Sequence, residues 1–223
     1  MLEKTDKPGS IGPIVLRENY DPTINQYLRL SNVISHSGQN CFVITTNIGN
    51  SVRGNIYTNI LNGENVRGSV KLKAGKYVIS AWIREGINST ATKLSYTNSE
   101  IRIIVDANTP ISLKPKGNIL DGWQRISGEF DIPANVNKVD IEFVGINNSS
   151  YFDDLRIHPF NANMKSFVYD PITLRLVAEL DENNYPTYYE YDKAGNLSHV
   201  KKVTEKGVQT VKEVRAGTVK KLQ

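Results

Sequence analysis

Short apolar runs separated by polar turn residues make up most of the chain. The runs are rich in Val, Ile, Tyr and Phe, and clusters of Asn, Gly and Ser stand between them. The sequence shows no sustained helical periodicity, and many short strands with turn signals between them are typical of an antiparallel sandwich or barrel. The predicted strands cover residues 27–30, 41–45, 66–72, 77–84, 101–105, 123–132, 139–144 and 151–157.

Alternation within two of these runs identifies a buried face. Residues two apart in a strand point to the same side of a sheet, and in both runs apolar residues take one side while charged residues take the other. Strands with one solvent-exposed side and one apolar side are typical of two sheets that share a core. The apolar sets are Ile126, Phe130 and Ile132 in the first run and Val139, Ile141 and Phe143 in the second.

A pair of residues recurs after residue 160. Tyr169-Asp170 and Tyr191-Asp192 are 22 residues apart, and each pair leads into a turn and an apolar residue. A period of this length indicates a repeated supersecondary unit. In the second copy, Ala194-Gly195-Asn196 tolerates positive φ between two strand-favouring segments. The sequence therefore predicts β-hairpins in this region.

The motif residues of the two copies are Tyr169, Asp170, Tyr191, Asp192, Gly195, Asn196 and Leu197. Over residues 165–215 they resemble the YD repeats of the RHS family. The second copy holds the complete motif, and the first is degenerate because Leu174 stands where the motif has Gly. Repeat arrays need about three or more units to bury a core. The resemblance therefore implies a partner, which is the preceding domain, another protein or the remainder of a repeat array.

Four earlier segments stand out as a set, namely Ser35–Phe42, Gly75–Arg84, Gly122–Phe130 and Tyr151–Ile157. In order and spacing they resemble landmarks of the galactose-binding-like jelly rolls that include many carbohydrate-binding modules. The resemblance covers residues of about 14–160. The opening segment of that family, typically with an Asn-Gly and an acidic residue, is not evident before Tyr27. The first strand, and any ligand that it supplies, therefore stays open.

Together these patterns predict an all-β chain, in which an antiparallel jelly-roll β-sandwich is followed by YD-repeat β-hairpins. The predicted parts are a lead-in arm (1–23), a jelly-roll domain (24–160), the hairpins (161–215) and a flexible tail (216–223). The connection at about 159–164 is only a few residues long. We therefore expect the hairpins to dock on the sandwich or to continue one of its sheets.

Composition and charge exclude several classes of partner. The 223 residues carry a net charge of +4 and are 39% hydrophobic, which is ordinary for a globular protein. No apolar run is long enough to cross a membrane. The lysines after His199 lack the interleaved aromatic residues of a nucleic-acid site. We therefore expect neither membrane insertion nor a nucleic-acid partner.

The start of the sequence and its cysteine content bear on location. Residues 1–7 do not resemble a signal peptide. The RHS resemblance nevertheless favours a fragment of a secreted or cell-surface bacterial protein. The single cysteine, Cys41, adjoins Phe42, Val43 and Ile44, and we expect it to be a buried hydrophobe rather than a nucleophile.

Asp153 is the candidate metal ligand. Alternation places it on one strand face with Tyr151, Leu155 and Ile157, where an unpaired carboxylate would be costly. Similar jelly rolls often hold a structural calcium ion at this position, helped by backbone oxygens of a turn that here would be 36–38. The alternative is that Asp153 accepts backbone N–H bonds or pairs with a basic side chain. No other cofactor is expected.

Trp82, Trp123 and Tyr96 are the candidate ligand-binding residues. Aromatic faces stack on sugar rings, and a glycan is therefore a possible partner. In similar modules both tryptophan landmarks are mainly structural, so packing in the core or at an edge is the alternative for Trp82 and Trp123. Tyr96 lies in a less regular stretch and could line a loop site.

The sequence gives little support to catalysis. His36, His158 and His199 lack a Ser, Cys or carboxylate constellation. Asp153 and Asp154 are adjacent, and on a regular strand they point to opposite faces. We expect no enzyme activity.

The leading functional hypothesis is a noncatalytic binding and scaffold portion of a large RHS-repeat protein. One alternative is a carbohydrate-binding module with the repeats as a spacer. Another is a cargo or subunit of a secretion or adhesion apparatus, recognised through the C-terminal segment from His199 onward.

Overall fold

The computed structural model describes residues 28–47, 49–60, 72–87 and 94–214. Within these ranges the chain forms three sheets, all strand pairs are antiparallel, and there is no helix. The described part accordingly contains no helix able to cross a membrane. The predicted lead-in arm (1–23), most of the predicted strand 66–72 and the predicted tail (216–223) lie outside the described residues.

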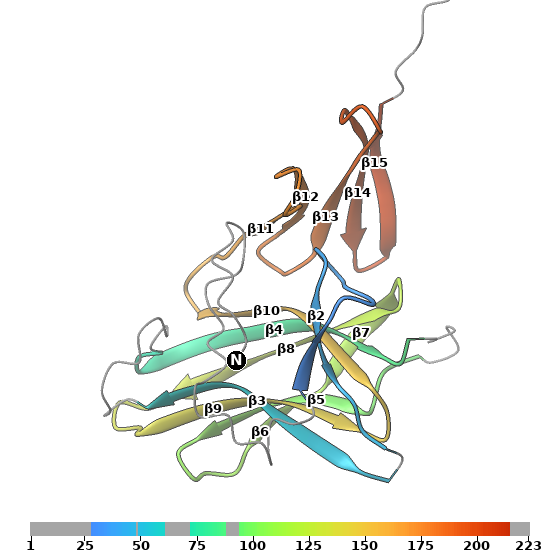
Figure 1. Cartoon of the computed structure of the whole chain (residues 1–223). Coiled ribbons are helices and arrows are strands. Elements are labelled where there is room, and N and C mark those ends of the chain that lie inside the picture. Colours follow the sequence, from blue (N-terminus) through green and yellow to red (C-terminus); the bar gives the residue numbers. More distant parts are fainter. Residues whose placement is uncertain (1–27, 48, 61–71, 88–93, 215–223) are drawn as a thin grey trace, which may run out of the picture.

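Two of the sheets form the expected sandwich (Figure 1). The six-stranded sheet has the order β1-β2-β10-β4-β8-β7, and the four-stranded sheet has the order β3-β9-β5-β6. From β2 to β5, and again from β8 to β10, successive strands alternate between the two sheets, as in a jelly roll. The strands are β1 (Leu28–Ser31), β2 (Cys41–Ile44), β3 (Ser51–Ile60), β4 (Gly75–Glu85), β5 (Ser99–Val105), β6 (Ile111–Leu113), β7 (Pro115–Leu120), β8 (Trp123–Ile132), β9 (Lys138–Ile146) and β10 (Ser150–Pro159).

The sandwich core is the one that alternation predicted. Both predicted apolar sets, from β8 and β9, are buried between the sheets. They join Ile79, Ile83, Ile101 and Ile103 from β4 and β5. The prediction of two sheets sharing one core is therefore confirmed.

Strands β3, β6 and β7 were not predicted from the sequence. Strand β3 contains Gly and Asn residues that disfavour strands in isolation, but it pairs with β9 along its whole length. At Gly54 the strand passes close to β1, because a Cβ built there would lie 2.8 Å from the Cβ of Leu28. A side chain at position 54 would therefore clash with β1, and packing requires the glycine.

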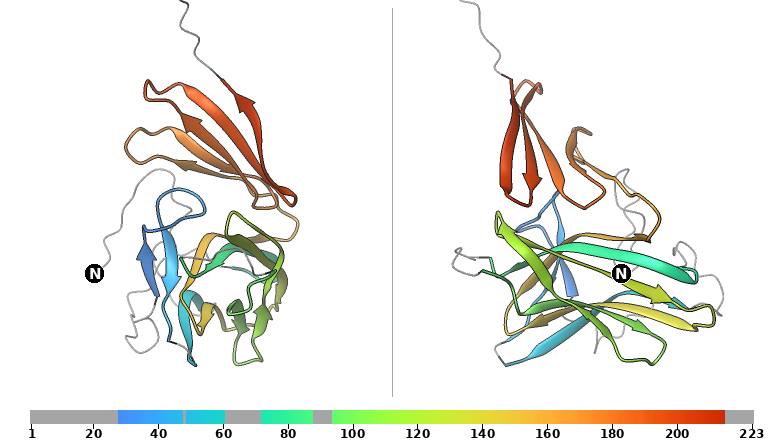
Figure 2. Two further views of the ribbon diagram at one scale, coloured as in Figure 1. Left: turned by 90° about the vertical axis from the view of Figure 1, so that its right-hand side faces the viewer. Right: turned by 180° about the vertical axis from the view of Figure 1, so that it is seen from behind.

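The third sheet is a five-stranded meander, in which each strand pairs with the next along the chain. It stands on the six-stranded sheet of the sandwich (Figure 2). Its strands are β11 (Ser166–Tyr169), β12 (Leu176–Leu180), β13 (Pro186–Tyr191), β14 (Leu197–Thr204) and β15 (Gly207–Glu213). The predicted hairpin turn at Ala194–Asn196 joins β13 to β14, with Gly195 at φ 86°.

Three aspartates head the first three turns of the meander at intervals of 11 residues. Asp170, Asp181 and Asp192 each donate a backbone N–H across the turn, and each side chain accepts backbone N–H groups within it. These bonds to the ionised form lower the pKa of Asp170 and Asp192. A residue with positive φ completes each turn, namely Leu174, Asn184 and Gly195. The 22-residue offset of the Tyr-Asp pairs therefore spans two turns of the same kind.

The two Tyr-Asp pairs also share a strand irregularity. The register shifts just before Tyr169 and again just before Tyr191, so both tyrosines pair beyond a bulge. Tyr191 donates its hydroxyl to the carbonyl of Leu176, which ties one hairpin to the next. The motif residues thus have packing and turn roles.

Candidate functional site

A β-bulge in β10 creates the site that stands out in this molecule. The pairing of β10 with β4 shifts register between Asp153 and Arg156, and Asp154 lies at φ 49°. Phe152 and Leu155 consequently both enter the sandwich core, although they are three residues apart. The alternation that placed Tyr151 on the face of Leu155 is broken, and Tyr151 packs on the opposite side.

Asp153 and Asp154 are brought together by this bulge, which corrects the prediction that they point to opposite faces. Both carboxylates contact the turn at His36 and Ser37. An extra residue in a strand removes the two-residue alternation on which the prediction depended. The two aspartates therefore meet a turn that is distant in the sequence, since His36 and Asp153 are 117 residues apart.

Asp153 is held by backbone donors. One carboxylate oxygen accepts N–H bonds from His36 at 2.7 Å and Ser37 at 3.2 Å, and the other accepts from Asp154 at 2.8 Å. Burial and the adjacent charge of Asp154 raise the pKa of Asp153, and the three N–H bonds oppose that shift. This is the arrangement that the sequence analysis gave as the alternative to calcium.

The surroundings of Asp153 do not fit a calcium site. Calcium needs about six to eight oxygen ligands, whereas the turn presents N–H donors to this carboxylate. Among the described residues no group of three or more His, Cys, Asp or Glu side chains is placed to hold a metal ion.

Asp154 bonds to two side chains of the same turn. Its carboxylate pairs with His36 Nδ1 at 2.6 Å and accepts the hydroxyl of Ser37. Because Ser37 and His36 bond to the same carboxylate rather than to each other, they do not form a nucleophile and its base. The His36 side chain is also only 4% exposed. The other histidines lie elsewhere, with His158 facing the carbonyl of Pro159 and His199 facing Glu190.

Aromatic rings surround His36 at the base of the meander. Its ring stacks on Trp82 at 4.4 Å and meets the edge of Trp123 at 5.5 Å between ring centroids. Tyr188 of β13 donates its hydroxyl to the carbonyl of His36 at 2.6 Å. We call the apolar group at this point the junction cluster, and it consists of Cys41, Trp82, Trp123, Tyr151 and Val203, with Tyr185 and Tyr188 packed against it.

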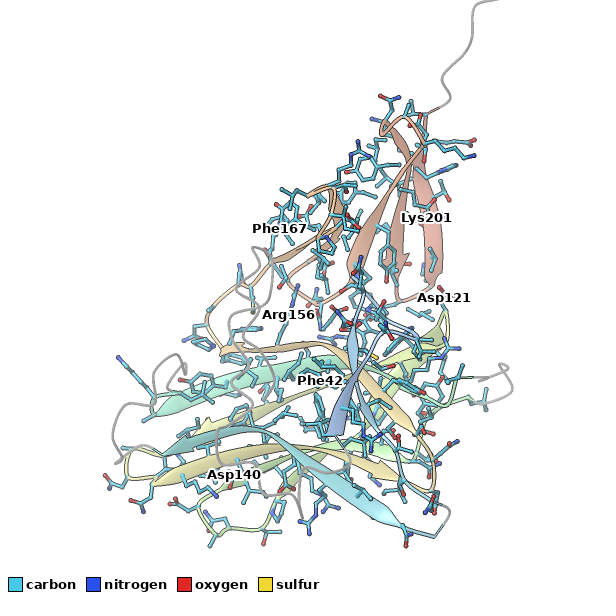
Figure 3. All side chains as sticks on the ribbon, in the orientation of Figure 1. Phe42, Asp121, Asp140, Arg156, Phe167 and Lys201 are labelled. Carbon is cyan, nitrogen blue, oxygen red and sulfur yellow. The ribbon has the colours of Figure 1, made fainter. Side chains whose placement is uncertain are left out.

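Arg156 and Asn184 join the sandwich to the meander by polar contacts. Figure 3 shows Arg156 between the six-stranded sheet and the meander. The Arg156 guanidinium donates to the carbonyl of Leu180 at 2.9 Å and also to the carbonyls of Asp181 and Met164. Asn184 is fully buried and donates to the carbonyl of Asp154 at 2.9 Å. The backbone carbonyl of Asn184 accepts the indole N–H of Trp82 at 2.6 Å. The prediction that the hairpins dock on the sandwich is confirmed by these contacts.

Neither Arg156 nor Asn184 was predicted as a site residue. Their partners are mostly backbone carbonyls, which every residue has, so the pairing has no pattern in the sequence. The one feature of the sequence that could have pointed to this site was the type and position of Asn184. Asn184 follows Asp181 at the spacing of Gly195 after Asp192, and Asn tolerates the left-handed conformation that this position requires.

The three candidate ligand-binding aromatic residues are buried. The exposed fractions of Trp82, Trp123 and Tyr96 are 0%, 4% and 2%. The two tryptophans belong to the junction cluster, and Tyr96 donates its hydroxyl to the carbonyl of Gly122. None of the three presents a face on which a sugar ring could stack, and the packing alternative for the tryptophans agrees with their positions.

Cys41 belongs to the junction cluster and gives a direct prediction. Burial, followed by the charge of Asp153, raises the pKa of the thiol to about 12. We expect no reaction of the native protein with a disulfide reagent at pH 8 and full reaction in denaturant, since the thiolate is the reactive form. An Ala194→Cys variant, with its thiol on an exposed turn, is the positive control. Rapid labelling of Cys41 in the native state would contradict the docked arrangement.

Comparisons with known proteins give structural similarities alone. No family model matches the chain, and no curated protein matches it. One similar solved structure is "Family 16 Carbohydrate Binding Module-2", with 12% identity, 59% of this chain and 85% of that chain covered, and a TM-score of 0.39. Another is the CBM22-1 xylan-binding domain from Paenibacillus barcinonensis Xyn10C, with 9% identity, 60% and 81% covered, and a TM-score of 0.39. TmCBM61 in complex with beta-1,4-galactotriose has 12% identity, 60% and 83% covered, and a TM-score of 0.38. Scores this low do not by themselves assign a family or a ligand.

Proposed function

We propose that this chain is a noncatalytic scaffold and binding portion of a larger secreted or cell-surface bacterial protein. In it, Tyr-Asp hairpins of the RHS type are fixed to a jelly roll of the galactose-binding-like type. The observation that carries the proposal is the junction cluster with its polar contacts. Buried aromatic packing and charged hydrogen bonds make two neighbouring units move as one body.

The meander supports a scaffold role because it depends on the sandwich. Among the described residues both apolar clusters include sandwich residues, and the meander contributes to the junction cluster through Val203, Tyr185 and Tyr188. A sheet that cannot bury a face alone is stable when it packs against another element. The sandwich thus fixes the direction in which the hairpins leave it.

Rigid coupling can be tested by measuring a distance across the junction. Spin labels at Ala134 on the sandwich and Ala194 on the meander, both exposed, are expected to give a narrow distance distribution. The matched control is a pair within the sandwich, at Ala134 and Asn148. Equal widths for the two pairs support the scaffold, whereas a much broader distribution across the junction would show a flexible tether.

Carbohydrate binding is the second candidate function, and one observation favours it. Although the predicted aromatic residues are buried, the meander exposes Phe167 and Tyr169 on one side of β11. Exposed aromatic rings at alternate strand positions provide faces for stacking on sugars. Any glycan site on this chain is therefore better sought on the meander than at Trp82 or Trp123.

A further inference from the structure

One side of the meander carries a row of side chains that runs across all five strands. We call it the Phe167 face, after its residue on β11. Cross-strand partners share a side of a sheet, and the pairing registers connect one residue of each strand in turn. The row is Phe167, Glu179, Thr187, Lys202 and Gln209. A second row beside it holds Tyr189, Val200 and Lys212.

Among the described residues, the Phe167 face is exposed or half-buried except at Val200, which is buried. The Phe167 side chain is 45% exposed, and Lys202, Gln209 and Lys212 are exposed as well. Within the two rows, Tyr189 donates its hydroxyl to Glu179 at 3.2 Å, and this bond stays inside the meander. Figure 3 shows Phe167 on the meander, well above the sandwich. The junction with the sandwich uses the other side, through Tyr188 and Val203.

Charge distinguishes the two sides of the meander. On the side of Tyr188, Lys201 pairs with Glu190 at 2.5 Å, and His199 faces the same carboxylate. On the Phe167 face, Lys202 and Lys212 form no ion pair with any described carboxylate. Two ammonium groups without an ion pair to a described carboxylate, on a face that also carries aromatic rings, favour a ligand that has both apolar faces and negative charges.

We propose that the Phe167 face binds an acidic polysaccharide, a chain of uronic acid units lying across the strands. This inference rests on the second candidate function, carbohydrate binding. Phe167 stacks on a sugar ring, Lys202 and Lys212 pair with carboxylates, and Glu179 accepts hydroxyl groups. Strands lie about 4.8 Å apart, so the row spans several sugar rings.

The same face is a poor match for single-stranded nucleic acid, which also combines stacking with negative charge. A nucleic acid carries a phosphate at every nucleotide and binds in a continuous positive groove. Here Glu179 lies in the middle of the aromatic half of the face, next to Phe167 in the pairing register. Its carboxylate repels either anion, but a uronic acid unit has ring hydroxyl groups that can donate to it, whereas a nucleotide within a DNA chain has none.

The test is binding of the full chain to oligogalacturonate, measured by calorimetry. Neutral galacto-oligosaccharides of equal length and single-stranded DNA are the comparison probes. We expect oligogalacturonate to bind most tightly, with affinity falling as salt rises. Phe167→Ala is expected to weaken binding about tenfold. Lys202→Gln with Lys212→Gln is expected to weaken it roughly fivefold and to remove the preference for the acidic glycan.

Matched controls are Phe160→Ala, an exposed ring outside the meander, and Lys201→Gln on its opposite side. Neither is expected to change glycan affinity. Tighter binding of neutral glycans would overturn the acidic ligand and leave carbohydrate binding standing. Binding of no glycan would overturn both, and preferential binding of DNA would replace the ligand class. Unchanged affinity in Phe167→Ala would remove this face as the site.

Discussion

Removal of residues 165–223 is expected to destabilise the sandwich strongly rather than to release a stable domain. The deletion uncovers Trp82 and Trp123, which are buried in the intact chain. Each ring buries on the order of 150–250 Å², and at about 25 cal/mol/Å² of apolar surface the two contribute several kcal/mol. We expect the melting temperature to fall by roughly 10–20 °C. Differential scanning calorimetry and binding of a hydrophobic dye measure the effect.

A smaller deletion provides the control for this experiment. Removal of 207–223 takes away β15 and leaves Tyr185, Tyr188 and Val203 in place over the tryptophans. Its effect on the sandwich should therefore be much smaller. If the fragment ending at residue 164 melted at the temperature of the intact chain, the junction cluster would not stabilise the sandwich, and the scaffold proposal would lose its basis.

Arg156→Ala is expected to be the most damaging single substitution at the junction. The Arg156 side chain is buried and donates to the carbonyls of Met164, Leu180 and Asp181. Its loss leaves one buried and two partly buried carbonyls without their charged donor, at a cost of about 3–5 kcal/mol. Chemical denaturation measures the free energy of unfolding, and labelling of Cys41 reports whether the junction has opened.

Two further variants separate the causes of that loss. Arg156→Lys keeps the charge but lacks the planar fork that reaches several carbonyls, so an intermediate loss is expected. Asn184→Gly keeps the left-handed turn and removes only the carboxamide bond to Asp154, which should cost about 1–2 kcal/mol. An Arg156→Ala protein with wild-type stability would show that the hydrogen bonds of Arg156 do not hold the meander on the sandwich.

Local chemistry made much of the fold predictable. Alternation identified β8 and β9 and their buried sets, because a two-residue period directly reports the side of a strand. The Tyr-Asp pairs identified the hairpins, because an aspartate before a turn and a residue tolerant of positive φ act within a few residues. Strand β3 was missed for the opposite reason, since its pairing with β9 outweighs a sequence poor in strand formers.

The candidate site was less predictable, because its residues meet from distant parts of the chain. Asp153 was singled out as a carboxylate in need of a partner, and its need is met by the N–H groups of His36 and Ser37. No sequence pattern predicted the bulge that turns Asp154 toward the same turn. Trp82 and Trp123 were recognised as notable, but only the docked meander decides that they are covered.

The sequence by itself thus determined most of the sandwich strands, the buried sets of β8 and β9 and the turns headed by Asp170 and Asp192, because these depend on neighbours along the chain. The tertiary structure alone decided the bulge at Asp153, the burial of the tryptophans and the hydrogen bonds that Arg156 and Asn184 form across the junction. Those features depend on backbone carbonyls and on surfaces brought together by folding, and a carbonyl at Leu180 or Asp154 is chemically the same as any other. Which acceptor meets which donor is fixed only when the meander rests on the sandwich.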